Sequence, residues 1–338
     1  MNKKSIAELG RAGLIETLSK ELHLKRESVI AGIGDDAAVL EKNESHYTLI
    51  SSETLVEGVA FDLAYTPFHQ VGIKCVTAAV SDIYAMNGTP QAVLVNIALP
   101  NRVSLDMLME LYRGLNMASV DYNCQIAGGD TTGSHNALII SVTAYGEVEK
   151  EKITFVNGAK EDHALCVTGD LGSAYAGLKI LLREKKHWEE ASDPVMQPDL
   201  SEWEYVVKRQ LLPVANKEMI EVFSEHKVVP GAMVDVSQGL IYDLKRMLKA
   251  SKTGAYLYQA ALPVDLETRK TADEMKDDVD NYALYGGEDF ELLFTLPESH
   301  VDKLAKMNQN FSVIGRISTL DEGLQMQTAE GEVMTFEN

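Results

Sequence analysis

The chain has 338 residues, of which 45% are hydrophobic and 24% are charged, and its 51 acidic and 31 basic side chains give a net charge of −20. This length is comfortable for two domains of roughly 150 residues each, and the composition is too apolar for a disordered chain. A surface this acidic argues against nucleic acid and against anionic membranes as partners, because both carry negative charge.

The sequence also indicates a compartment. No apolar run approaches the roughly 18–20 residues that cross a bilayer, and Lys3 and Lys4 are not followed by the apolar stretch of a signal peptide. Cys75, Cys124 and Cys166 lie far apart, without a CxxC pair, which suits buried thiols in a reducing environment. We therefore expect a cytoplasmic protein.

Apolar spacing predicts alternating helices and strands through the first half of the chain. A helix is expected over residues 14–22, where four apolar residues repeat at helical spacing. Pro67 is well placed to open a helix that runs to about Met86, and Ser104 is the expected N-cap of a third helix. The expected strands of this half are a short one before residue 32 and longer ones at 47–51, 91–99 and 137–148.

A charged stretch at 147–152 follows the last of these strands, and we place a domain boundary there. The prediction is an N-terminal domain of residues 1–150 and a C-terminal domain of residues 151–338.

The alternation continues in the second half, although residues 187–200, with two prolines and several acids, are expected to form an irregular insertion. The pattern predicts the α/β class, with two domains that are each a mixed β-sheet covered by helices. The expected strands are at 165–168, 232–236, 255–262, 289–296 and 311–318, and the expected helices at 172–183, 203–211, 216–226, 239–250, 267–277 and 298–308.

The common phosphate-binding motifs are missing from the sequence. It contains no GxxxxGK[ST] loop, no GxGxxG and no protein-kinase HRD or DFG set. A nucleotide site must therefore rest on other residues.

Six segments place carboxylates beside glycines or at the ends of predicted strands, and a single such segment is usually a turn or a helix cap. Asp82 is different, because it lies four residues from Ala78 on the apolar side of a predicted helix. It is also near the C-terminal end of that helix, where the helix dipole disfavours an anion, so a buried Asp82 needs a cation. The six segments contain Asp35 and Asp36, Glu53, Asp82, Asp130, Asp235, and Glu288 with Asp289.

The inventory of oxygen atoms in these segments suits Mg²⁺. This ion takes about six oxygen ligands and is usually held by one or two carboxylates together with waters and phosphates. Several ions would need carboxylates from several strand ends and hydroxyls such as Ser51, Ser52 and Ser237, while glycines would let a phosphate approach the backbone. The spacing in the sequence leaves open whether these segments converge.

Read in order, seven segments resemble the successive motifs of the thiamine-monophosphate kinase family, over about residues 5 to 320. The wider superfamily includes aminoimidazole ribonucleotide synthetase, selenophosphate synthetase and hydrogenase-maturation proteins, which share the two-domain fold and the use of ATP. DIYAMNG together with GGEDFELLF points to the thiamine branch. The seven segments are GIGDDAAVL, SSETLVEGVAF, VSDIYAMNG, IAGGDTTGS, VTGDLGSAYAGL, VDVSQGL and YGGEDFELLF.

The resemblance implies phosphoryl transfer from ATP to thiamine monophosphate, which yields thiamine diphosphate and ADP without a phosphoenzyme. Catalysis would then rest on positioning and on several Mg²⁺ ions rather than on a catalytic side chain. The resemblance also implies a homodimer joined through the N-terminal domains, which carry the ATP and Mg²⁺ site that the C-terminal domain completes. The implied metal ligands are Asp36, Ser51, Ser52, Glu53, Asp82, Asp130 and Asp235; the implied ATP contacts are Gly129, Asp130 and Ser237; the implied substrate contacts are Glu288 and Phe336.

Four positions depart from the family pattern, and all four fall in the implied site. Glu53 replaces an aspartate, Ala60 a histidine that contacts the substrate, Val156 an arginine that contacts ATP, and Gln238 an aspartate that binds metal. Glutamine offers a neutral carbonyl oxygen without a charge, and nearby lysines at 150, 152 and 160 lack the planar fork of arginine.

These departures leave three interpretations open. The first is an active kinase with an altered site. The second is a divergent paralogue that binds nucleotide and metal but lacks the kinase activity, and the third is an ATP-dependent enzyme of the same fold that acts on another small acceptor.

Overall fold

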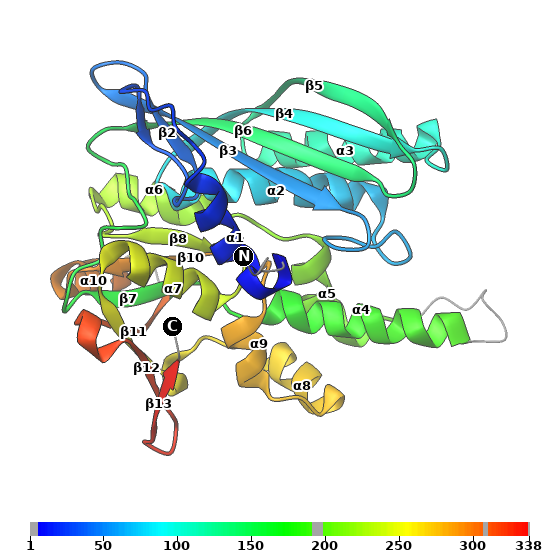
Figure 1. Cartoon of the computed structure of the whole chain (residues 1–338). Coiled ribbons are helices and arrows are strands. Elements are labelled where there is room, and N and C mark those ends of the chain that lie inside the picture. Colours follow the sequence, from blue (N-terminus) through cyan, green and yellow to red (C-terminus); the bar gives the residue numbers. More distant parts are fainter. Residues whose placement is uncertain (1–5, 191–198, 307–309, 337–338) are drawn as a thin grey trace, which may run out of the picture.

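Residues 6–190, 199–306 and 310–336 are described by a computed structural model, in which two mixed β-sheets are covered by helices (Figure 1). This arrangement confirms the expected α/β class. No helix within these residues is long and apolar enough to span a membrane.

The first sheet, here called the N-terminal sheet, has the strand order β1-β2-β3-β6-β4-β5. Only the β4–β5 pair is parallel, and the others are antiparallel. The elements of this part are α1 (Ile6–Ser19), β1 (Val29–Ala31), β2 (Ala38–Glu41), β3 (His46–Val56), α2 (Phe68–Ala85), β4 (Thr89–Pro100), α3 (Leu105–Asp121), β5 (Gln125–Ser134) and β6 (Ile139–Glu149).

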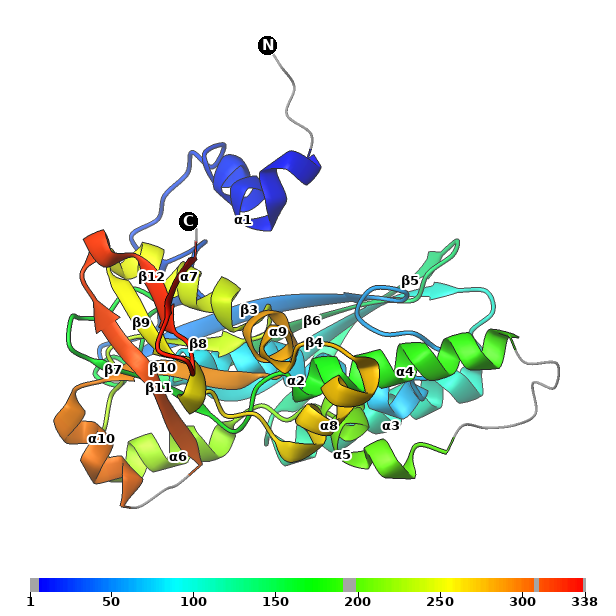
Figure 2. The same ribbon diagram turned by 90° about the horizontal axis from the view of Figure 1, so that it is seen from below.

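The long strands of the N-terminal sheet bury alternate residues, because one face packs on α2 and α3 and the other is open (Figures 1 and 2). The open face includes Ser52 and Thr54 of β3 and Leu94 and Asn96 of β4, which are exposed. The strand expected at 91–99 is therefore buried on one side only.

Helix α2 is central to the molecule. From Val71 to Ala85 all but one of its residues are buried, and many of them are small. It crosses α3 so closely that a Cβ at Gly114 would lie 1.7 Å from the carbonyl oxygen of His69. Glycine at this position lets α2 and α3 pack backbone to backbone.

The second sheet, here called the C-terminal sheet, has the strand order β13-β12-β9-β11-β7-β10-β8, in which only β9 and β12 are parallel. Its strands are β7 (Ala164–Thr168), β8 (Met233–Val236), β9 (Gly254–Tyr258), β10 (Glu291–Leu296), β11 (Phe311–Ser318), β12 (Leu324–Gln327) and β13 (Val333–Phe336). The helices are α4 (Ser173–Glu190), α5 (Glu204–Leu211), α6 (Lys217–His226), α7 (Leu240–Ser251), α8 (Leu266–Met275), α9 (Val279–Tyr285) and α10 (Glu298–Ala305), with 3₁₀ turns at Ser201–Trp203, Gln259–Ala261 and Leu320–Glu322.

Three apolar clusters hold these layers together. The largest lies between the two sheets and joins residues such as Ile83 of α2, Ile140 of β6 and Phe294 of β10. A second covers the other face of the C-terminal sheet beneath α7, and a third holds α4, α5, α8 and α9 together. The first cluster thus fixes α2 between the two sheets, so that both sides of this helix are packed.

Several expected elements are confirmed. The helix predicted from Pro67 is α2, and Ser104 caps α3 by accepting a hydrogen bond from the backbone N–H of Met107. The strand expected at 311–318 is β11.

Other expectations were wrong at their ends or missed an element. The N-terminal helix ends at Ser19, the strand expected at 255–262 ends at Tyr258, and α4 continues to Glu190, so that residues 187–190 are helical rather than irregular. Residues 191–198 of the expected insertion lie outside the described residues, as do 307 and 308 of the last expected helix. The sequence pattern did not predict β2, β5, α9, β12 or β13.

Candidate active site

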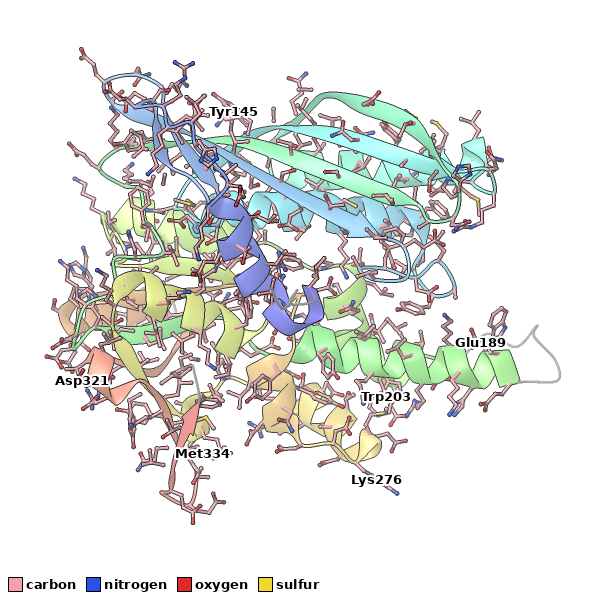
Figure 3. The ribbon with its side chains drawn as sticks, in the orientation of Figure 1. Tyr145, Glu189, Trp203, Lys276, Asp321 and Met334 are labelled. Carbon is pink, nitrogen blue, oxygen red and sulfur yellow. The ribbon has the colours of Figure 1, made fainter. Side chains whose placement is uncertain are left out.

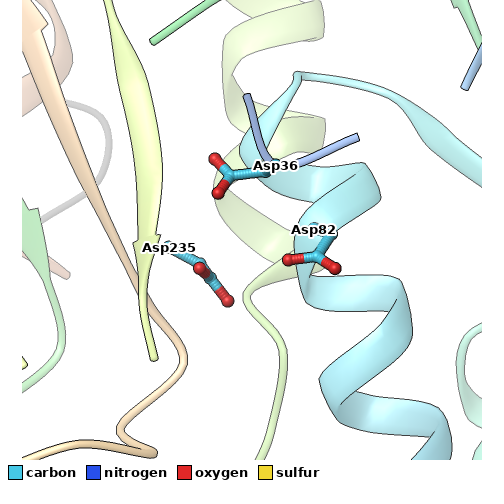
Figure 4. Close-up of side chains that lie close together, drawn as sticks. All are labelled: Asp36, Asp82 and Asp235. Atoms are coloured by element: carbon cyan, nitrogen blue, oxygen red, sulfur yellow. The ribbon is translucent and has the colours of Figure 1, made fainter. Parts of the chain in front are cut away.

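Three buried carboxylates converge between the two sheets. Asp36 comes from the turn before β2, Asp82 from the last turn of α2, and Asp235 from β8, and Figure 4 shows the three side chains close together. Each offers an oxygen atom within 4.8 Å of the others. These three residues are here called the carboxylate cluster.

Burial is the main electrostatic fact about this cluster. It raises the pKa of Asp36 and of Asp82 well above the usual aspartate range, and the negative charge of Asp235 raises both further. Burial also raises the pKa of Asp235, against hydrogen bonds from Ser81 and Ser237 that lower it. Carboxylates this close together in a buried place repel one another when all are ionised, unless a cation lies among them.

The donor set fits a hard divalent cation such as Mg²⁺. All three groups are oxygen ligands, and the Oδ2 atom of Asp36 is buried without a hydrogen-bond partner, so it has a lone pair to offer. Mg²⁺ is usually bound through carboxylates and completed by waters and phosphates, which is the composition that this cluster allows.

Two serines orient Asp235 within the cluster. The Oγ atom of Ser81, on α2, donates a hydrogen bond of 2.8 Å to Oδ2 of Asp235, and the Oγ atom of Ser237 donates one of 3.1 Å to Oδ1. The first of these bonds ties α2 to β8. Ser81 was not assigned a role from the sequence, although its position beside Asp82 in a buried helix was visible there.

Arg246 of α7 lies against the cluster. Its Nη2 atom donates to Oδ1 of Asp36, and the negative charges of Asp36 and Asp243 help to raise its own pKa. Burial raises the pKa of Asp243 to about 7, and this carboxylate accepts a hydrogen bond of 2.9 Å from the backbone N–H of Gln238. A charged residue in an amphipathic helix gives no distinctive signal in the sequence, so neither Arg246 nor Asp243 was predicted as a site residue.

Strand β3 divides its three candidate residues between two faces of the sheet. Ser51 faces α2 and donates a hydrogen bond of 2.8 Å to the carbonyl of Ala79, and Glu53 lies on the same side, where burial and then the charge of Asp235 raise its pKa. Ser52 is exposed on the open face, 3.3 Å from Oγ1 of Thr143. The structure therefore brings Ser51 and Glu53 toward the cluster and does not bring Ser52 there.

Gly129 and Asp130 lie on the edge strand β5 and not in a loop. A Cβ at Gly129 would lie 1.8 Å from the carbonyl of Val95, so β5 can approach β4 in this way only with glycine at that position. Asp130 is exposed, and the register aligns it with Asn96 of β4 and, through β6, with Thr54 of β3. Three strand spacings separate it from β3, about 14 Å, so Asp130 does not join the cluster of its own chain.

Glu288 lies along the same side of α2 as the cluster. Its Oε2 atom accepts hydrogen bonds from Nζ of Lys74 at 2.7 Å and from Nε2 of Gln210 at 2.9 Å. Lys74, whose side chain is 3% exposed, precedes Ser81, which bonds Asp235, by seven residues, which is about two turns or about 10 Å along the helix. One face of α2 thus spans the carboxylate cluster and Glu288.

The backbone around Glu288 is held in a conformation that such residues rarely adopt. Glu288 and Phe290 have φ angles of 65° and 53°, and left-handed conformations of this kind cost on the order of 1–3 kcal/mol each. Asp289, between them, accepts hydrogen bonds from the backbone N–H groups of Gly172 and Ala174 at the start of α4. The motif GGEDF is therefore an anchored turn that sets the position of the Glu288 side chain.

The remaining candidate positions are placed as follows. The side chain of Val156 is buried in the core beneath α7, Gln238 is exposed after the end of β8, and the carbonyl of Ala60 accepts a hydrogen bond of 3.0 Å from Lys74. Phe336 packs against the C-terminal core on the edge strand β13, which Met334 marks in Figure 3. The strand order puts β13 at the opposite edge from β8 and β10, so the structure does not bring Phe336 beside Glu288.

Comparisons with known proteins agree with this fold. The family model described as "AIR synthase related protein, N-terminal domain" matches residues 34–148. The thiamine-monophosphate kinase of Bacillus subtilis is 32% identical over 273 residues, covering 81% of this chain and 79% of that protein. The thiamine-monophosphate kinase of Aquifex aeolicus is 31% identical over 314 residues, covering 92% of each.

A solved structure described as "AaThiL complexed with AMPPCP and TMP" is similar over 100% of this chain and 98% of that one, with a TM-score of 0.83 and 28% sequence identity.

Proposed function

Because the chain belongs to the thiamine-monophosphate kinase family, and is thus a phosphotransferase, we propose that it transfers a phosphoryl group from ATP to thiamine monophosphate, yielding thiamine diphosphate and ADP. The observation that carries this proposal is the shared face of α2, which has the carboxylate cluster at one end and Glu288 two turns away. A phosphate-handling end and an acceptor-handling end on one helix suit a direct transfer between two bound substrates.

At the phosphate end, Asp36, Asp82 and Asp235 would hold Mg²⁺, with Ser51 and Glu53 on the same side of β3. Bound Mg²⁺ would neutralise the phosphate charges and orient them for in-line transfer. Ser81 and Ser237 keep Asp235 in place for this task, and Ser237 is also the proposed ATP contact at the end of β8.

At the acceptor end, Glu288 would accept a hydrogen bond from the acceptor. Its carboxylate has one oxygen, Oε2, occupied by Lys74 and Gln210, and its side chain is 30% exposed.

We also propose that a second copy of the chain covers the open face of the N-terminal sheet. This face carries Leu94, which is 44% exposed and is aligned across the strands with Ser52, Thr143 and Gly128. Asp130 lies on the same face, about 14 Å from β3 of its own chain. If Asp130 serves as a metal ligand, a second copy would have to complete the site around it.

The test is to incubate the purified protein with ATP, Mg²⁺ and thiamine monophosphate and to measure thiamine diphosphate by chromatography. We expect product from the parent and from Asp106→Asn, an exposed control on α3, and a loss of product in Asp130→Asn with an unchanged melting temperature. Unchanged turnover in Asp130→Asn would remove Asp130 from the metal site.

Absence of product from the parent, with ATP binding still visible by calorimetry, would favour the paralogue without this activity. Product from a different acceptor would favour the third interpretation, an enzyme of the same fold with another substrate.

A further inference from the structure

The ion pair between Arg246 and Asp36 is only half satisfied. The guanidinium of Arg246 reaches Oδ1 of Asp36 through one nitrogen, Nη2. The other carboxylate oxygen, Oδ2, and the Nε atom of Arg246 are both buried and have no hydrogen-bond partner. An acceptor and a donor without partners therefore lie on the two members of one ion pair.

The two unpaired atoms suit ligands of opposite charge. Oδ2 belongs to a carboxylate whose side chain is 2% exposed and which shares the cluster with Asp82 and Asp235, so it suits a cation. The Nε–H group of Arg246 is a charged donor and suits an anion. A divalent cation that carries a phosphate would satisfy both atoms at once, and leaving either atom unpaired in a buried place is unfavourable.

The charge of Arg246 is needed at this place because its surroundings are acidic. Asp36, Asp235 and Asp243 all act on its guanidinium. These carboxylates would repel a phosphate that approaches the cluster. The positive charge of the guanidinium among them offsets that repulsion. Arginine is suited to the task, since its planar fork matches the oxygens of a phosphate.

The turn that carries Asp36 is also in contact with Val156. The backbone N–H of Val156 donates a hydrogen bond of 3.2 Å to Oδ2 of Asp35, and Ser251 of α7 donates one of 3.3 Å to the carbonyl of Val156. The side chain of Val156 is itself buried in the core and offers no hydrogen-bond donor. Arg246 places its guanidinium against Asp36, the next residue of this turn.

We propose that Arg246 binds a phosphate of the nucleotide. The guanidinium that rests on Asp36 would donate to phosphate oxygens, next to the divalent cation that Asp36, Asp82 and Asp235 would hold. This inference rests on the proposed function, because it requires that the chain bind a nucleotide with Mg²⁺.

The experiment measures the dissociation constant of MgATP by calorimetry for the parent, Arg246→Ala and Arg246→Lys. Arg113→Ala, an exposed arginine of α3, is the matched control. Loss of charged hydrogen bonds to phosphate predicts binding roughly tenfold to a hundredfold weaker in Arg246→Ala. A smaller loss is expected in Arg246→Lys, which keeps the charge but not the fork, and no change in Arg113→Ala.

Mn²⁺ binding without nucleotide, followed by electron paramagnetic resonance, separates this role from a structural one. We expect Arg246→Ala to bind Mn²⁺ at least as tightly as the parent, because the guanidinium no longer competes with Mn²⁺ for Asp36. Arg246→Lys, which keeps a cation beside Asp36, guards against a folding defect in the alanine variant.

Two results would overturn the inference. One is MgATP binding in both Arg246 variants within twofold of the parent. The other is loss of Mn²⁺ and MgATP binding together with a lower melting temperature, which would make Arg246 a structural counter-ion. A parent that binds no MgATP would instead refute the nucleotide part of the proposed function, and this inference with it.

Discussion

Nζ of Lys74 lies 2.7 Å from Oε2 of Glu288, so a buried ammonium group on α2 meets the carboxylate that follows α9. The Lys74 side chain is 3% exposed and that of Glu288 is 30% exposed. The pair joins the part of the chain that carries the N-terminal sheet to the part that carries the C-terminal sheet, and it fixes the carboxylate that we assign to the acceptor.

Lys74→Met should destabilise the protein and weaken acceptor binding. Methionine fills a similar volume but leaves Glu288 with Gln210 as its partner, and we expect a loss of roughly 1–3 kcal/mol in the free energy of unfolding. Urea denaturation and the KM values for both substrates test this, with the KM for the acceptor rising more than the KM for ATP. Lys208→Met, at an exposed position of α5, is the control. Equal shifts in both KM values would show that Lys74 does not act through Glu288.

Asp82→Asn should stabilise the protein in the absence of metal, which is the reverse of the usual effect of a buried substitution. The amide removes one negative charge next to Asp36 and Asp235, and the expected gain is about 1–2 kcal/mol. The same change should weaken Mn²⁺ binding. Denaturation in EDTA and a Mn²⁺ titration measure the two effects, with Asp106→Asn as an exposed control. A variant that is less stable than the parent in EDTA would contradict the prediction.

The stability of the metal-free protein should fall as the pH rises from about 5 to 7. Burial raises the pKa of Asp36 and Asp82 well above the usual range and that of Asp243 to about 7. Such groups hold protons more tightly in the folded chain than in the unfolded chain, where the pKa is about 4, so stability is lost between these two values.

Melting temperatures in EDTA and in Mg²⁺ across this pH interval test that prediction. With Mg²⁺ the fall should be smaller, because the cation neutralises the carboxylates that protons otherwise neutralise. A melting temperature that rises steadily from pH 5 to 7 in EDTA would be inconsistent with it.

Leu94→Arg should convert the proposed dimer to a monomer. Leu94 is 44% exposed on the open face of the N-terminal sheet, where an arginine would place an unpaired charge in a covered interface. Sedimentation velocity on the parent and the variant measures the change. Leu105→Arg, at a position of α3 that is 72% exposed, should leave the mass of the particle unchanged. A parent that sediments as a monomer would rule out the proposed interface.

Part of the site could be predicted from the sequence. Asp82 was recognised because a carboxylate stood on the apolar side of a helix, and the structure places it in the carboxylate cluster. The same reasoning applies to Lys74, which precedes Ser81 by seven residues on the same side of α2, and the period of a strand would have put Ser51 and Ser52 on opposite faces.

Other features depend on contacts that no local pattern contains. The sequence pattern did not predict the strand that contains Asp130 and its neighbouring glycines, and only the close approach of β5 to β4 explains a strand made of such residues. The contact between Arg246 and Asp36 joins residues 210 positions apart. Helical periodicity predicted the helix that contains Arg246. It carries no information about the contact of this side chain with the turn that holds Asp36.

The division of the carboxylate cluster between the two halves of the chain has a consequence for assembly. Asp36 and Asp82 precede β6, whereas Asp235 follows β7. A fragment that ends between these strands holds two of the three acids, and its complement holds one. Binding of the divalent cation that we propose for this cluster would therefore report that both halves have docked in register, and a split version of the chain should bind it tightly only after reassembly.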